Sequence, residues 1–64
     1  MFTIYSEVLK DYIRIENNNF YRALGNIQEY KTKEEALQVI EKAAKLDSLN
    51  KSIYNKIKPL VKEI

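Results

Sequence analysis

The chain has 64 residues, which is enough for a single domain over residues 1–64 with one core. Its 45% hydrophobic and 31% charged residues are typical of a folded globular domain and exclude a disordered chain. It contains no cysteine and no histidine, which excludes disulfides and the usual zinc ligands. A domain this small is marginally stable by itself, so we expect it to form a homo-oligomer.

The net charge of +2 comes entirely from residues 33–64, because acidic and basic residues balance in residues 1–32. This surplus is well below that of a typical nucleic-acid binder. The longest stretches without a charge, residues 1–6 and 23–28, are far shorter than the roughly 20 apolar residues of a membrane span. We therefore expect no membrane partner and a cytoplasmic, intracellular location.

Residues 4–15 carry apolar side chains on one side of a helical wheel and charged side chains on the other, which predicts a first helix. Residues 12–16 also alternate as a strand would, and the asparagines at 17–19 could close a hairpin with residues 20–24. Both interpretations of this stretch stay open.

In residues 19–30 the apolar residues Phe20, Leu24 and Ile27 lie at helical spacing. Asn19 before them is a suitable N-cap, so the pattern indicates a helix, although Gly25 weakens it. Thr32 and Glu35 form a capping box that predicts a helix from residue 32 to about residue 46.

After Asp47 and Ser48, either of which could cap, apolar residues at helical spacing predict a last helix that reaches residue 64. Pro59 lies inside this segment and predicts a kink or a break near Lys58. The expected fold is therefore all-α, a small helical domain built as a three- to four-helix bundle. The alternative is an α+β fold with one N-terminal β-hairpin packed on two C-terminal helices.

The residue types that most enzymes use are missing. Without histidine or cysteine, no side chain titrates near neutral pH in its ordinary state, and Ser6, Ser48 and Ser52 have no histidine to activate them. A chain with one glycine has no phosphate loop or dinucleotide motif. The adjacent Glu34 and Glu35 fit a helix cap better than a metal site. We expect no enzymatic activity, no cofactor and no metal.

Residues 43–58 resemble the helix-turn-helix of DNA-binding regulators, with Ala44 as the packing residue, Leu49 in the turn and Asn50 as the cap. The turn lacks a glycine, and the spacing from Ala44 to the turn is one residue shorter than in the pattern. The resemblance implies a recognition helix in the major groove. Lys51, Lys58 and Lys62 share one face of the predicted helix, which suits phosphate or simply water. The candidate contacts to nucleic acid or another partner are Asn50, Lys51, Ser52, Asn55, Lys58 and Lys62.

The function predicted by elimination is that of a small non-enzymatic interaction protein, a regulator, adaptor or inhibitor that docks on another protein. The alternative is a helix-turn-helix-like DNA-binding regulator that uses residues 43–58. The many Asn, Lys, Ile, Tyr and Phe residues have AT-rich codons, which suits a phage or mobile-element accessory protein. For self-association we expect an interface formed by Tyr5, Val8, Tyr12, Ile15 and Phe20.

Overall fold

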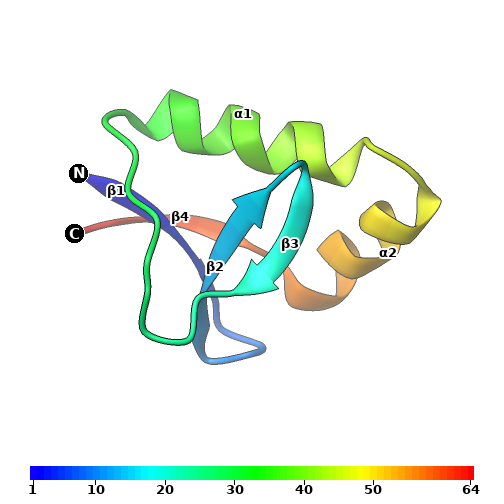
Figure 1. Ribbon diagram of the computed structural model, residues 1–64, viewed down its shortest axis with the longest axis horizontal. Helices are drawn as coiled ribbons and strands as arrows, with labels where there is room; N and C mark the ends of the chain where they lie inside the picture. The colour runs from blue at the N-terminus through cyan, green and yellow to red at the C-terminus, as the bar shows by residue number, and fades with distance from the viewer.

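The computed structural model describes residues 1–64 and has an α+β fold, a four-stranded antiparallel sheet with two helices against one face (Figure 1). The strands are β1 (Phe2–Ser6), β2 (Asp11–Glu16), β3 (Asn19–Arg22) and β4 (Leu60–Glu63), and the helices are α1 (Lys33–Ala44) and α2 (Ser48–Ile57). The strand order is β3-β2-β1-β4. Both chain ends therefore lie together, and the Ile64 N–H donates to the Met1 carbonyl at 2.9 Å.

Asn17 and Asn18 close the hairpin between β2 and β3. Their φ angles are 52° and 60°, and two consecutive residues in this left-handed region produce the type of tight turn that matches the twist of a hairpin. Asparagine tolerates this conformation better than most residues. The register that results pairs Ile15 with Phe20 and Glu16 with Asn19.

The prediction of an all-α, three- to four-helix bundle, a small helical domain, is wrong, and the α+β alternative describes the fold. Residues 4–15 and 19–30 contain strands and turns, and residues 60–63 form β4. The reason lies in β1, which is flanked by strands on both sides and covered on both faces. Thr3 and Ile4 point to opposite faces, yet both are fully buried. The sequence of this part of the chain therefore does not alternate strictly between apolar and polar residues. Its apolar residues match helical spacing by coincidence.

The two predicted helix starts are confirmed. The Thr32 hydroxyl accepts a hydrogen bond from the Glu35 N–H at 3.1 Å, and the Asp47 carboxylate accepts one from the Asn50 N–H at 2.8 Å. The break near Lys58 is also confirmed, because α2 ends at Ile57 and Lys58 turns the chain with a φ of 48°. The helix predicted beyond Pro59 is wrong: proline fits the start of an edge strand, and β4 follows it.

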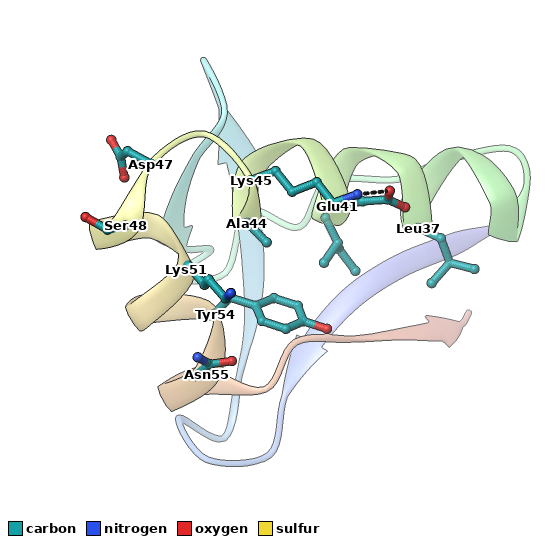
Figure 2. Close-up of a pocket in the computed structure, with 10 residues that line it drawn as sticks. Leu37, Glu41, Ala44, Lys45, Asp47, Ser48, Lys51, Tyr54 and Asn55 are labelled. Atoms are coloured by element: carbon teal, nitrogen blue, oxygen red, sulfur yellow. Dashed lines mark hydrogen bonds and ion pairs between the residues drawn. The ribbon is translucent and has the colours of Figure 1, made fainter.

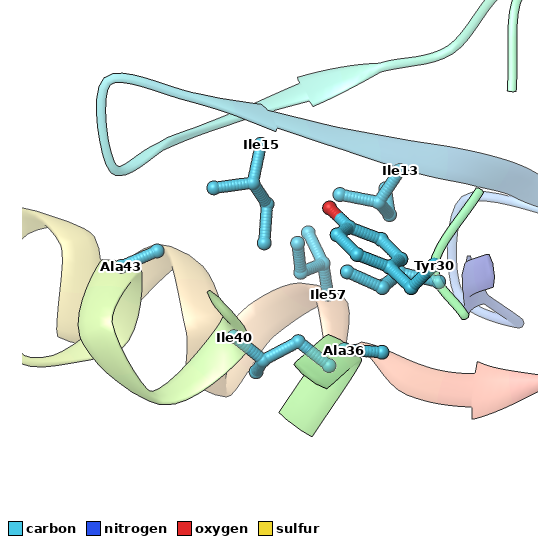
Figure 3. Close-up of a cluster of buried hydrophobic side chains, with 8 residues drawn as sticks. Ile13, Ile15, Tyr30, Ala36, Ile40, Ala43 and Ile57 are labelled. Atoms are coloured by element: carbon cyan, nitrogen blue, oxygen red, sulfur yellow. The ribbon is translucent and has the colours of Figure 1, made fainter. Parts of the chain in front are cut away.

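The core lies between the sheet and the two helices (Figure 3). Ala36 and Ala43 of α1 are fully buried, and their small side chains let the helix backbone lie close to the sheet. The residues of the cluster are Ile4, Ile13, Ile15, Tyr30, Ala36, Ile40, Ala43 and Ile57.

Residues 28–30 insert between β1 and β2 where the two strands separate. The register that pairs Ile4 with Ile13 would bring Phe2 opposite Ile15, but Phe2 instead exchanges two backbone hydrogen bonds with Tyr30, at 2.9 and 2.7 Å. The Ile15 N–H donates to the side-chain oxygen of Gln28 at 3.1 Å. The Gln28 amide therefore replaces the strand partner that Ile15 would otherwise lack.

Two side chains on the sheet face away from the helices hold this inserted segment in place. The Thr3 hydroxyl donates to the Gln28 carbonyl at 2.7 Å, and the Arg14 guanidinium donates to the Asn26 carbonyl at 3.0 Å. The segment between β3 and α1 thus covers part of the second sheet face. This cover explains why Thr3 is fully buried.

We predict that Ile4→Ala lowers the free energy of unfolding by about 2 to 5 kcal/mol, because it removes a fully buried side chain and leaves a cavity. Leu24→Ala, at an exposed position, should change it by less than about 0.5 kcal/mol. Urea unfolding measures both. If Ile4→Ala does not fold, Ile4→Val should still cost roughly 0.5 to 1.5 kcal/mol, and equal stability of this variant and the native chain would contradict the prediction.

Tyr30 makes the stability depend on alkaline pH. Burial raises the pKa of its hydroxyl. The charge of Arg14 lowers this pKa by a smaller amount, and the charge of Glu35 raises it further. The phenol therefore ionises more readily in the unfolded chain, so the free energy of unfolding should fall as pH rises above about 10. In Tyr30→Phe this fall should be smaller, and the lost hydrogen bond to Gln28 should cost about 1 kcal/mol at neutral pH. Urea titrations between pH 7 and 11 decide this, and parallel pH profiles for the two proteins would contradict it.

Candidate functional site

A groove of about 700 Å³ lies in the angle between α1 and α2 and opens to solvent (Figure 2). Leu37, Ile40 and Ala44 line it from α1, and the Tyr54 ring extends into it from α2. Leu37 keeps 46% of its surface exposed, so it gives the groove accessible apolar area. The volume lies within the range of sites that bind ligands or peptide side chains.

Charges of both signs surround this apolar surface. Glu41 and Lys45 form an ion pair at 2.7 Å, and this hydrogen bond lowers the pKa of the Glu41 carboxyl. Asp47 and Lys51 line the groove at its α2 side. The four charges cancel, so the groove as a whole has no preference for an anionic or a cationic ligand.

The structure brings only part of the predicted contact set together. Lys51 and Asn55 line the groove, whereas Ser52 is exposed on α2 outside it. Lys58 is the left-handed C-cap residue of α2. Lys62 lies on β4, where its ammonium group stands 4.8 Å from the centre of the Tyr5 ring.

Asn50 is part of the fold, not of the surface. It is 3% exposed, and its side-chain amide donates to the Asn18 carbonyl at 2.6 Å and to the Ala43 carbonyl at 3.1 Å. These bonds join α2 to the hairpin turn and to the end of α1. They leave the amide no freedom to read a base edge.

The five residues predicted for self-association do not form one surface. Tyr5 and Tyr12 touch edge to face on the sheet side away from the helices, with ring centres 5.0 Å apart. Val8 is exposed in the turn between β1 and β2. Ile15 is buried in the core, and Phe20 packs against that core.

Sequence reasoning missed Leu37, Glu41 and Tyr54 as members of a site. The apolar stripe of residues 36–46 is broad, and Leu37 falls within it as an apparent core residue. The available signal was the width of this stripe, because packing against one sheet cannot bury all of its apolar side chains. The sequence pattern does not predict the angle between α1 and α2. This angle leaves Leu37 outside the core.

Comparison of the chain with protein-family models, with curated proteins and with solved structures found no match. Neither helix has the length and apolar character that crossing a bilayer requires. The acidic side chains do not gather in groups of three or more that could hold a metal ion.

We predict that Asn50→Ala lowers the free energy of unfolding by about 1 to 3 kcal/mol, because it removes the buried hydrogen bond to the Ala43 carbonyl and the bond to the Asn18 carbonyl. Lys51→Ala, next to it on the exposed face, should stay within about 0.5 kcal/mol of the native chain. Thermal and urea unfolding of both variants measure the difference. Equal stability of the two would show that the Asn50 amide contributes nothing to the fold.

Proposed function

We propose that this chain is a non-enzymatic interaction protein that holds an apolar segment of a partner protein in the α1–α2 groove. The observation that carries the proposal is the groove itself, an exposed apolar floor with a balanced charged border in a small domain. Apolar anchors that enter such a hollow supply most of the binding energy of protein interfaces, and the surrounding polar groups set orientation.

The balance of charge favours protein over nucleic acid as the occupant. Glu41 and Asp47 stand beside Lys45 and Lys51, so a phosphate that approaches the groove meets carboxylates as well as ammonium groups. A partner segment that carries apolar side chains flanked by charges of both signs fits this border. Regulation, inhibition or assembly of the partner would follow from occupation of the groove.

DNA binding is the second candidate, and one observation favours it. The two helices meet at residues 45–47, and α2 exposes Lys51, Ser52 and Asn55, three of the side chains expected on a recognition helix. In this alternative α2 would enter the major groove. Its affinity would fall steeply with salt, because phosphate contacts release counterions.

The groove proposal predicts that Leu37→Lys weakens partner binding at least about tenfold, because it places a charge on the apolar floor. Leu49→Lys is the matched control, since Leu49 is also an exposed helical leucine, 67% exposed, but lies outside the groove. A photo-crosslinking residue at position 54 in the native host captures the partner. Crosslinking should be lost with Leu37→Lys and kept with Leu49→Lys, and both variants should retain the native melting temperature.

Two results would contradict the proposal. One is a crosslinked partner that Leu37→Lys and Leu49→Lys affect equally. The other is salt-sensitive binding to duplex DNA that Lys51→Ala with Asn55→Ala abolishes while the fold is retained, which would assign the protein to the DNA-binding alternative.

A further inference from the structure

β4 is an edge strand whose outer backbone groups have no partner. Phe2 directs its N–H and carbonyl to Tyr30, so it forms no ladder bonds with Glu63, the residue opposite it on β4. Because ladder bonds alternate along an antiparallel pair, Leu60 and Lys62 bond to β1, and Val61 and Glu63 direct their backbone groups away from the sheet. An edge of this kind is a template for another strand.

The lysine of β4, which could protect this edge, points the other way. Lysine on an edge strand normally discourages pairing, because its charge would have to be desolvated. The Lys62 ammonium instead lies 4.8 Å from the ring centre of Tyr5 on β1 and 5.9 Å from that of Tyr12 on β2. These cation–π contacts draw the charge toward the middle of the sheet. Leu60, with 41% of its surface exposed, is left beside the open edge.

The opposite edge of the sheet is occupied differently. The hairpin turn that leads into β3 is fixed to α2 by the Asn50 amide, and Arg22 at the end of β3 pairs with Asp11 at 3.2 Å. The α2 helix therefore lies against β3 and the hairpin turn beside it, and the ion pair joins β3 to β2. At the β4 edge the outward backbone groups are those of Val61 and Glu63, and the exposed Glu63 side chain places one negative charge at the end of this edge.

From this arrangement we infer that two copies of the chain pair through β4, antiparallel and about a twofold axis, to form one continuous sheet. With Val61 opposite Val61 of the second copy, their outward N–H and carbonyl groups bond to each other. Leu60 then faces Lys62 of the second copy on the sheet face away from the helices, so no like charges meet. A shift of two residues would place Lys62 against Lys62, which disfavours that register.

The β4 edge is self-complementary, which is why a second copy fits it better than an unrelated strand. A twofold axis perpendicular to the sheet keeps both helical layers on the same side. It also brings the Tyr5, Tyr12 and Lys62 clusters of the two copies onto one face. The resulting dimer supplies the additional burial that a domain of this size lacks.

The test compares three proteins: the native chain, Leu60→Lys, and the double variant that combines Leu60→Lys with Lys62→Glu. Sedimentation measures the mass of each protein from micromolar to millimolar concentration. The native mass should rise toward that of a dimer. Leu60→Lys places lysines opposite each other and should weaken dimerisation roughly tenfold. The double variant places the new lysine of one copy opposite the new glutamate of the other and should restore dimerisation.

A second measurement keeps the inference falsifiable if a variant folds poorly. In the native chain, exchange of the Val61 amide proton should slow as concentration rises, while exposed amides such as that of Leu49 stay unchanged. A monomeric mass at every concentration overturns the inference, as does a dimer that Leu60→Lys leaves intact. Weakening that Lys62→Glu does not reverse contradicts the register and overturns it as well.

Discussion

The insertion of residues 28–30 between β1 and β2 is the constraint on which the rest of the structure depends. It supplies hydrogen bonds to two strands that separate, and it brings the Tyr30 ring into the core. It also sets the position of Thr32, the N-cap of α1, which lies two residues after Tyr30. Without the Gln28 amide, the Ile15 N–H would lose its hydrogen-bond partner, at a cost of about 1 to 3 kcal/mol.

Two other polar side chains fix the position of α2. The Ser6 hydroxyl donates to the Ile57 carbonyl at 2.6 Å and accepts from the Leu9 N–H at 3.2 Å, which ties the last turn of α2 to β1. Asn50 ties the first turn of α2 to the hairpin. With both ends of α2 attached, the angle to α1 is set by buried hydrogen bonds, and this angle creates the groove. A shape defined in this way is part of the folded chain itself and needs no ligand to form.

The helices could be predicted from the sequence because their signals are local. Thr32 with Glu35 and Asp47 three residues before Asn50 are caps that act over one turn, and both are present in the structure. The sheet could not be predicted with the same ease. β1 has Thr3 and Ile4 buried on opposite faces, so its pattern reflects neighbours that lie far away along the chain. The groove escaped prediction for the same reason, since the position of Leu37 depends on a helix angle that no local pattern encodes.

The pairing of β1 with β4 joins the first strand of the chain to the last. Contacts between residues so distant in sequence close a long loop, and folds rich in such contacts form slowly. Of the four strands β4 is synthesised last, so β1 lacks its hydrogen-bond partners on that side until residues 60–63 have been made. The β1–β2 and β2–β3 pairings are local and can form early, whereas the β1–β4 pairing must wait. Until then β1 is itself an open sheet edge, so the four-stranded sheet is completed only when its last strand has been made.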